Sequence, residues 1–468
     1  MSATGKLRVA IVGAGAAGLC VARHVSSRST TFDPPVVYEL TDHVGGTWFY
    51  EERVGIHDNG HPVHSSMYRD LRTNLPKEVM MFPDYPFDAQ LPSFLSHRDI
   101  LQYLQKYCKR HAITPYIKVF KFSTFQHCGG RGETHLHGDS RRGSCDVGGN
   151  FTWHVWRAEH TDIRLGVHLQ WSLCEGSCVE KSHRLLCMTH VFFLFYRHYS
   201  TPHLPSILGI EHFKGKVMHS HSYRCREPFA HQSVVVLGAG SSGVDISFEL
   251  VQANAKVTLS HNKPALAFPL PPEIQQAPPV VKVLEDGSLL FQDGSVAHAE
   301  VLLFCTGYSF HFPFLCPKLG LGIQHHLVAP LYKYLLPPAF PSLFFVGICK
   351  IICPFIHFHY QVQFALAVLE GTVQLPSRKM MEEAAEHERQ MKVQKGVQEK
   401  HLLQMGSDQW EYYLDLATIA GISPPNPVVE SLYEEVGRQR RMNPQAYRQI
   451  NYKLVDATHW QVLGATDT

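Results

Sequence analysis

The sequence has almost no net charge, no long apolar run and no disulfide-framework spacing of its cysteines, and these absences argue against three classes of protein. Lysine and arginine number 43 and aspartate and glutamate 41, so the net charge of +2 gives no basic surface of the kind that nucleic-acid binding requires. The best apolar run, Val191 to Tyr196, is far shorter than the roughly 20 residues of a membrane-spanning helix. We therefore expect no nucleic-acid partner and no transmembrane anchor.

The start of the chain and its cysteines favour a cytoplasmic protein. A short polar segment leads directly into an apolar strand pattern at Val9, which leaves no room for a signal peptide. The 12 cysteines are scattered among apolar residues without a disulfide spacing, as in proteins of a reducing compartment. A chain of 468 residues corresponds to two or three domains of about 150 residues each.

The N-terminal segment predicts a strand, a glycine turn, a helix and a second strand. In VAIVGAGAAGL the three glycines follow an apolar strand, with a spacing that allows a tight turn, close approach to a pyrophosphate, and close helix–strand packing. Glu39 ends the next strand, 21 residues after Gly18, where a carboxylate accepts ribose hydroxyls. The pattern predicts a dinucleotide site formed by Gly13, Ala14, Gly15, Ala16, Ala17, Gly18 and Glu39.

A second copy of this pattern lies in the middle of the chain, in VVVLGAGSSGVDI. The strand that follows it ends in LSHNK instead of an acid, so a 2′-phosphate is accepted and NADP is favoured over NAD. Lys263 is the main candidate for that phosphate contact, and a solvated loop lysine is the alternative. The predicted site residues are Gly238, Gly240, Ser241, Ser242, Gly243, Asp245 and Lys263.

Two dinucleotide motifs in one chain predict a flavoenzyme of the α/β class. The first site holds FAD and the second brings NADPH to it, so that the cofactors supply the redox chemistry. Apolar spacing also predicts a helix over 96–112, which Ser96 can cap, and a solvated helix over 377–394.

The segment between the two motifs distinguishes between kinds of flavoenzyme. FKGKVMHSHSY has Phe213, Gly215, His219 and Tyr223 in the spacing FxGxxxHxxxY, which resembles the fingerprint of the flavin-containing monooxygenases. Related Baeyer–Villiger enzymes usually carry Trp where Tyr223 stands, so the resemblance favours oxygenation of a heteroatom over oxygenation of a ketone. For His219 a structural role and a chemical role both stay open.

Other segments resemble the same family. Gly45 to Trp48 (GGTW) is similar to its FAD-contacting turn, which implies that Gly46, Thr47 and Trp48 contact FAD. Arg72 to Phe82 resembles its active-site segment, which implies that Thr73 contacts flavin and NADP. By the same resemblance Asn74 is the candidate catalytic residue beside the reactive face of the flavin, where an amide can donate a hydrogen bond without titrating. Later similar segments are Thr306–Gly307–Tyr308 and LFFVG (Leu343 to Gly347), with Pro354, Phe355 and Gln361 beyond.

The resemblance implies an architecture of two Rossmann-like domains. The NADP-binding domain, residues 206–304, is inserted into a discontinuous FAD-binding domain formed by residues 1–205 and 305–468. The polar C-terminal sequence is most similar to that of the glucosinolate S-oxygenase-like and N-oxygenase-like members. The oligomeric state is left open, with a homodimer as one option.

The resemblance also implies a reaction. NADPH reduces FAD, the reduced flavin takes up O2 as a C4a-hydroperoxide, and a soft sulfur or nitrogen nucleophile of a small molecule attacks the distal oxygen. A dry pocket prevents premature loss of hydrogen peroxide. The implied enzyme is similar to the N,N-dimethylaniline monooxygenases of xenobiotic metabolism.

The resemblance fails between about residues 126 and 197, a segment rich in His and Cys. We expect an insert from an atypical splice form or gene model, which replaces or removes one strand of the FAD domain; a family-specific loop is the alternative. Cys174, Cys178, His183 and Cys187 lack a zinc spacing, so no metal is expected.

Two other functions stay open at this stage. A flavin-dependent NADPH reductase or oxidase needs a redox dithiol or an open acceptor site near the flavin, and the sequence contains no CxxC. A catalytically impaired relative that binds nucleotide and serves as an interaction protein is compatible with the irregular segment.

Overall fold

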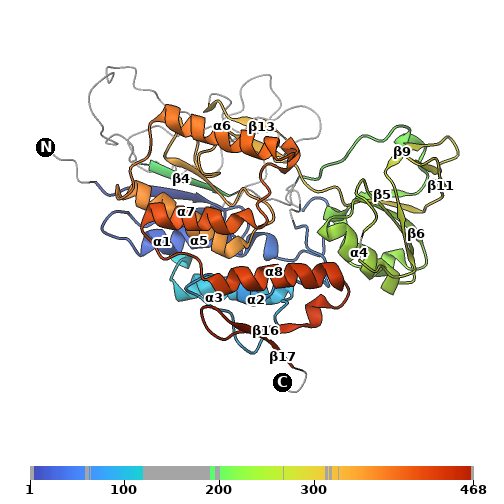
Figure 1. The fold of residues 1–468 in the computed structure, drawn as a ribbon, viewed down its shortest axis with the longest axis horizontal. Helices are drawn as coiled ribbons and strands as arrows, with labels where there is room; N and C mark the ends of the chain where they lie inside the picture. Colours follow the sequence, from blue (N-terminus) through green and yellow to red (C-terminus); the bar gives the residue numbers. More distant parts are fainter. Residues whose placement is uncertain are drawn as a thin grey trace, which may run out of the picture.

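The computed structural model describes residues 5–57, 63, 65–119, 190–195, 201–266, 268–310, 312, 315, 319–324 and 326–464. The four residues weighed above as metal ligands lie outside these ranges. Within them the chain forms two five-stranded parallel sheets with helices packed around them (Figure 1).

The first sheet contains the N-terminal glycine motif. Its strand order is β15-β4-β1-β2-β3, and every neighbouring pair is parallel. Parallel sheets are covered on both faces, which explains why β4 and β15 are almost continuously apolar. The strands are β1 (Arg8–Val12), β2 (Val36–Glu39), β3 (Ile117–Val119), β4 (His190–Phe195) and β15 (Leu343–Val346).

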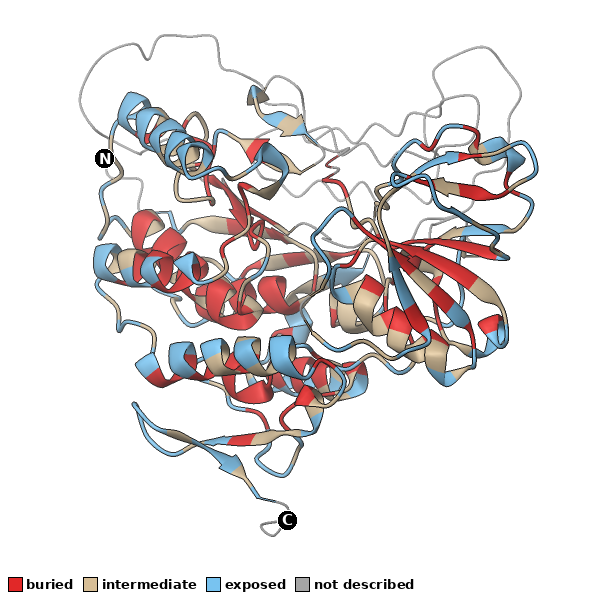
Figure 2. Ribbon diagram, turned by 45° about the vertical axis from the view of Figure 1, so that its right-hand side comes forward, coloured by how far each residue is buried: buried red, intermediate tan, exposed pale blue. Residues whose placement is uncertain are grey.

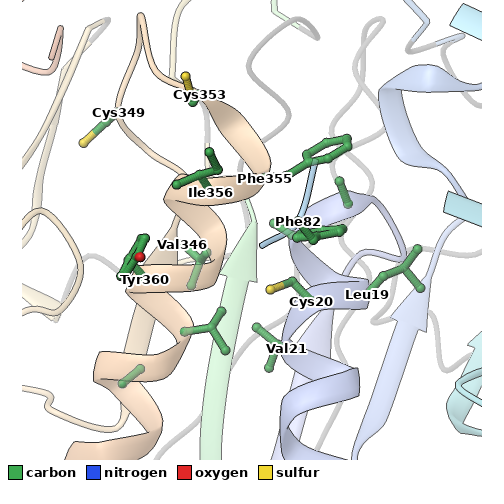
Figure 3. Packing of buried hydrophobic residues seen from close by; sticks show 14 of the residues in the cluster. Leu19, Cys20, Val21, Phe82, Val346, Cys349, Cys353, Phe355, Ile356 and Tyr360 are labelled. Atoms are coloured by element: carbon green, nitrogen blue, oxygen red, sulfur yellow. The ribbon is translucent and has the colours of Figure 1, made fainter. Parts of the chain in front are cut away.

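Two helices from distant parts of the sequence pack together on this sheet. Helix α1 (Ala16–Ser26) follows the glycine turn, and α5 (Pro354–Leu369) begins with a proline at its first position, where the missing N–H costs nothing. Figure 3 shows Leu19, Cys20 and Val21 of α1 in one cluster with Phe355, Ile356 and Tyr360 of α5.

The second sheet contains the internal glycine motif and has the strand order β5-β12-β6-β7-β8, again entirely parallel. Its strands are β5 (Lys216–His219), β12 (Val301–Phe304), β6 (Ser233–Leu237), β7 (Lys256–Ser260) and β8 (Ile274–Ala277). Helix α4 (Ser241–Gln252) covers one face, and a small antiparallel sheet of β9 (Val280–Val283), β10 (Leu289–Phe291) and β11 (Val296–Ala297) covers the other.

The period of two in β6 accounts for this layering. Val234 and Val236 belong to the apolar cluster beneath α4, whereas Val235 and Leu237 belong to the cluster beneath the small sheet. Figure 2 shows the corresponding buried strands of the second sheet, set apart from the buried strands of the first. The two parallel sheets therefore have separate apolar cores.

The remaining elements surround the first sheet. The capping box that Ser96 forms with Asp99 starts α3, and Ser377 caps α6, so both helices expected from the sequence are confirmed. The helices are α2 (Lys77–Met80), α3 (His97–Arg110), α6 (Arg378–Gln394), α7 (Asp408–Ala420) and α8 (Pro427–Met442); the hairpins pair β13 (Gly322–Gln324) with β14 (Leu327–Ala329) and β16 (Asn451–Leu454) with β17 (Trp460–Leu463).

The expected insert is wrong for its last part. Residues 190–195 form β4, which lies between β1 and β15 in the first sheet, with Val9 beside Val191 and Phe344 beside Phe193. The alternative in which a strand is missing is therefore wrong at this position of the sheet. A short apolar run between polar segments can be recognised as a strand only when its two partner strands are known.

We predict that Phe193→Ala destabilises the protein by about 3–5 kcal/mol, because this fully buried ring stacks on Phe344 with centroids 4.9 Å apart. The neighbouring Phe192 is partly exposed, so Phe192→Ala should cost clearly less. Thermal unfolding of the two variants measures the difference. Equal melting temperatures would contradict the position of β4 inside the sheet.

Candidate functional site

The first glycine turn brings helix α1 into contact with strand β1. Gly13 has φ +105°, a conformation that favours glycine, and its N–H donates to the Tyr38 carbonyl at 2.7 Å. A Cβ on Gly18 would lie 1.9 Å from the Gly13 carbonyl oxygen. Only glycine at Gly18 therefore allows this close approach of helix and strand.

Glu39 lies at the end of β2, beside this turn. Its side chain is 2% exposed, and its Oε2 accepts a 2.7 Å hydrogen bond from the Ala14 N–H. Its Oε1 accepts from the N–H and the hydroxyl of Thr41, at 3.0 and 2.9 Å. The carboxylate is thus held in a fixed position at the strand end where the sequence predicts ribose binding.

The GGTW segment packs directly on the glycine turn. The Gly45 N–H donates to the Ala14 carbonyl at 3.0 Å, and a Cβ on Gly46 would lie 2.9 Å from Gly15 Cα. The hydroxyl of Thr47 is buried and has no hydrogen-bond partner. Trp48, at the end of this 3₁₀ turn (η1, Gly46–Trp48), is partly buried against the same core.

These features fit a dinucleotide such as FAD. Helix α1 begins at Ala16, after Gly15 as an N-cap without a side chain, and has no acidic residue in its first turn, so its free N–H groups suit an anionic pyrophosphate. Ala16 and Ala17 form that first turn. The Thr47 hydroxyl, buried and unpaired beside this turn, is a polar group that a ligand can pair.

The second glycine turn repeats the first. Gly238 has φ +108°, and its N–H donates to the Ser260 carbonyl at 2.8 Å. A Cβ on Gly243 would lie 1.8 Å from the Gly238 carbonyl oxygen, whereas a Cβ on Gly240 would meet nothing within 4 Å. Ser241 and Ser242 begin α4, which again has no side-chain cap and no acid in its first turn.

The residues that replace the ribose-binding acid gather around one pocket. It has a volume of about 400 Å³, lies beyond the ends of β7 and β8, and has no acidic residue among those that line it. The Lys263 ammonium donates to the Ala239 carbonyl at 3.3 Å, which places the positive charge beside the glycine turn. His261, Asn262, Lys263, Gln276 and Gln292 are the polar residues of this pocket.

The FxGxxxHxxxY residues lie in and around β5, the edge strand of the second sheet, and bond it to its neighbours. Gly215 has no room for a side chain, because a Cβ would lie 2.3 Å from the Glu300 carbonyl oxygen. The buried Tyr223 hydroxyl donates to Glu249 Oε2 at 2.7 Å, and Phe213 belongs to the apolar cluster beneath the small sheet. Burial raises the pKa of Glu249 to about 7, although the Tyr223 hydrogen bond lowers it.

His219 has a structural role in this segment. Its Nδ1 accepts from the His221 N–H at 3.0 Å, and its Nε2 lies 3.0 Å from the Gly307 carbonyl oxygen, so we assign the proton to Nε2. Burial lowers the pKa of His219 to about 4, although the Gly307 hydrogen bond favours the charged form. Neutral His219 therefore links the end of β5 to the Thr306–Gly307–Tyr308 segment.

Thr73 and Asn74 lie next to each other but differ in exposure. Thr73 is 3% exposed, its N–H donates to the Leu95 carbonyl at 2.8 Å, and its hydroxyl accepts from the Leu95 N–H at 2.9 Å. Asn74 is exposed. The buried threonine thus anchors the backbone from which the asparagine amide projects.

Arg224, which directly follows the fingerprint tyrosine, was not expected from the sequence. It is 7% exposed, and burial lowers its pKa. Its guanidinium donates to the carbonyls of Glu51, Arg53, Ser65, His221 and Tyr223. A buried arginine that donates only to backbone carbonyls has no sequence signal, because its partners are formed by chain geometry.

Asp245 has a partner that the sequence did not indicate. Its two carboxylate oxygens accept hydrogen bonds from Arg448, at 3.1 and 2.7 Å. Within the described structure this residue thus joins α4 to the C-terminal segment.

The comparisons with known proteins agree with this geometry. The sequence profile described as "Flavin-binding monooxygenase-like" matches residues 6–128, 175–268 and 273–463. The chain belongs to this family. Because the match resumes at residue 175, the end of the supposed insert is ordinary family sequence, in agreement with β4.

Similar proteins of this family come from plants and an insect. The chain is 32% identical over 464 residues to flavin-containing monooxygenase FMO GS-OX-like 4 of Arabidopsis thaliana, which covers 94% of this chain and 93% of the relative. It is 29% identical over 467 residues to senecionine N-oxygenase of Tyria jacobaeae, with 97% and 91% covered. The structure of S-allyl-L-cysteine S-oxygenase from Allium sativum has a TM-score of 0.75 and 29% identity, with 95% of each chain covered.

These findings confirm the expected family, the α/β fold class, and an FAD-containing, NADPH-dependent monooxygenase as the enzyme class. No helix in the part of the chain that the structure describes is long and apolar enough to cross a membrane. Among the same residues, no three His, Cys, Asp or Glu side chains gather as metal ligands.

One glutamine joins the LFFVG segment to the helices packed beside it. Gln361 of α5 is fully buried, and its Oε1 accepts from the Gly347 N–H at 2.8 Å. Its Nε2 donates to the Tyr412 hydroxyl at 2.9 Å. The end of β15 is thereby tied to α5 and α7.

We predict that two glycine variants of the second turn affect different properties: one weakens NADP⁺ binding and the other lowers the free energy of unfolding. Gly240→Ala should change the free energy of unfolding by less than about 0.5 kcal/mol, because the methyl has free space. It should weaken NADP⁺ binding at least tenfold, because the backbone can no longer approach the pyrophosphate. Gly243→Ala should destabilise by about 3 kcal/mol.

Isothermal titration with NADP⁺ and thermal unfolding measure these two properties separately. Unchanged NADP⁺ affinity in Gly240→Ala would show that the phosphate does not lie at this turn.

Proposed function

We propose that the protein is an NADPH- and O2-dependent flavin monooxygenase that oxygenates a soft sulfur or nitrogen atom of a small molecule. The observation that carries this proposal is the pair of matching glycine turns, each at the end of its own parallel sheet, joined by the FxGxxxHxxxY segment. We propose residues 1–205 and 305–468 as the FAD-binding domain and 206–304 as the NADP-binding domain. The C4a-hydroperoxyflavin route is part of the proposal.

The residues around the first turn would hold FAD. Glu39 would accept the ribose hydroxyls, and the first turn of α1 would bind the pyrophosphate. The unpaired Thr47 hydroxyl and the adjacent Trp48 would contact the same cofactor. FAD would supply the electron transfer and the activation of O2.

The residues around the second turn would hold NADPH. The first turn of α4 with Ser241 and Ser242 would bind its pyrophosphate, and Lys263 its 2′-phosphate. The exposed Asn74 amide would donate a hydrogen bond to the reacting flavin, because an amide keeps its proton across the working pH range.

Sulfur and nitrogen both fit as the acceptor atom. Sulfur oxygenation is supported by the name of the Allium sativum enzyme and nitrogen oxygenation by that of the Tyria jacobaeae enzyme. The tyrosine at Tyr223 supports a heteroatom over a ketone.

The cysteines speak against a reductase that uses a protein dithiol. All cysteines in the described part of the chain are free, and all but Cys225 are buried. Burial raises the pKa of Cys349 and Cys353, so neither thiol is a ready nucleophile. An NADPH oxidase that releases hydrogen peroxide is therefore the alternative to be tested.

The proposed function is tested with FAD-reconstituted protein supplied with NADPH and ¹⁸O2. A dialkyl thioether and a tertiary amine should each gain one ¹⁸O atom by mass spectrometry, whereas a cyclic ketone should give no lactone. Asn74→Ala should lower product per NADPH by about tenfold or more while FAD stays bound.

Three results would contradict this proposal. Release of one hydrogen peroxide per NADPH, without labelled product, would show that the protein is an NADPH oxidase. Lactone formation would assign ketone oxygenation. Failure to bind FAD would assign a catalytically impaired relative.

We predict that Lys263→Ala raises the KM for NADPH by about tenfold to a hundredfold, because it removes a charge-assisted hydrogen bond to the 2′-phosphate. The KM for NADH should stay unchanged. Lys256→Ala, which removes an exposed lysine from the same strand segment, is the control. If both cofactors respond equally to Lys263→Ala, this lysine does not recognise the 2′-phosphate.

A further inference from the structure

A C-terminal arginine connects the two halves of the proposed site. Arg448 lies in η8 (Tyr447–Gln449), the 3₁₀ turn between α8 and β16. Its Nη atoms donate to the two carboxylate oxygens of Asp245 on α4, at 3.1 and 2.7 Å. Its Nε donates to the Thr73 carbonyl at 2.9 Å. One side chain thus bonds both the NADP-side helix and the segment that carries Asn74.

This contact is built into the interior. The side chains of Arg448 and Asp245 are only 18% and 17% exposed, and the guanidinium lies over the Tyr447 ring, 4.8 Å from its centroid. Burial by itself lowers the pKa of Arg448, but Asp245, Tyr447 and Tyr68 together raise it above its ordinary value. The arginine is therefore held in its charged form.

A second contact joins the same elements. Arg440, near the end of α8, donates to the Ser241 hydroxyl at 2.9 Å, at the first residue of α4. Ser241 and Asp245 are four residues apart and so lie on one face of α4. Arg440 of α8 and Arg448 of the turn after it thus both bond residues in the first half of α4, and the end of α8 lies near α4 in Figure 1.

The Thr73 carbonyl links the position of the Arg448 guanidinium to the backbone of Asn74. Thr73 is already bonded to Leu95 through its N–H and its hydroxyl, which leaves its carbonyl as the acceptor for Arg448. The peptide unit that contains this carbonyl also contains the Asn74 nitrogen. A shift of the guanidinium therefore shifts the backbone of Asn74.

We propose that Arg448 is a positioning residue that sets the distance between the Asn74 segment and the NADP-side helix α4. The inference rests on the proposed function, in which Asn74 and NADP meet at the flavin. A lysine cannot replace it, because a single ammonium cannot form a bidentate pair with Asp245 and also reach the Thr73 carbonyl in the guanidinium plane.

The test compares Arg448→Ala, Arg448→Lys and Asp245→Asn with the wild-type holoenzyme. Arg438→Ala is the matched control, because the exposed Arg438 bonds neighbours on its own helix, Glu435 at 2.6 Å and Met442 at 2.8 Å. Three quantities are measured: amide hydrogen exchange of residues 72–75, the Kd of NADP⁺, and labelled product formed per NADPH consumed.

Arg448→Ala and Arg448→Lys should raise the exchange rate and the Kd at least tenfold and lower product per NADPH. Asp245→Asn should raise the Kd with little effect on exchange, since the bond to Thr73 remains. Arg438→Ala should match the wild type in all three.

A purely stabilising role would give a different pattern. If Arg448→Ala lowers the melting temperature but leaves the Kd and product per NADPH unchanged, the proposal is overturned. If Arg448→Ala does not fold, Arg448→Lys and Asp245→Asn decide by the same criteria. If the wild type forms no labelled product, the proposed function fails by itself, and the exchange and NADP⁺ measurements still decide the role of Arg448.

Discussion

The distance between helix and strand at the two glycine turns is the constraint on which the rest of the structure depends. In both motifs a methyl group on the third glycine would come within 2 Å of the first glycine's carbonyl, at 1.9 Å for Gly18 and 1.8 Å for Gly243. Any side chain there would move the helix away from the strand, together with the uncapped first turn that we propose as the pyrophosphate site. The GGTW turn packs on Gly15 of the first motif, and Lys263 bonds the Ala239 carbonyl of the second.

The two sheets have separate apolar cores, so polar contacts carry much of the connection between them. Tyr68 belongs to the core beneath α4. Two arginines, the buried Arg224 and the partly buried Arg448, add hydrogen bonds between distant segments. Arg224 binds backbone carbonyls of the loop after the GGTW turn, and Arg448 binds a carboxylate and a carbonyl. A guanidinium suits such a joint because its rigid fork of five donors fixes direction as well as distance.

The family fingerprint between the motifs also has a mainly structural basis. Gly215 permits a backbone contact, His219 joins β5 to the segment after β12, and Tyr223 bonds α4 through Glu249. From the sequence alone, a structural role and a chemical role both stay open for His219. The hydrogen-bond partners of His219 and Tyr223 give both side chains a structural role at the edge of the second sheet.

The two dinucleotide motifs, the α/β class and the replacement of the ribose-binding acid by LSHNK can be read from the sequence, because they depend on short-range spacing and on local glycine conformation. The folded chain was needed to show that β4 belongs to the first sheet, that Asp245 pairs with Arg448, and that His219 is bonded at both ring nitrogens. Each of these depends on a partner far away in the sequence, and no local pattern encodes which distant groups the folded chain brings together.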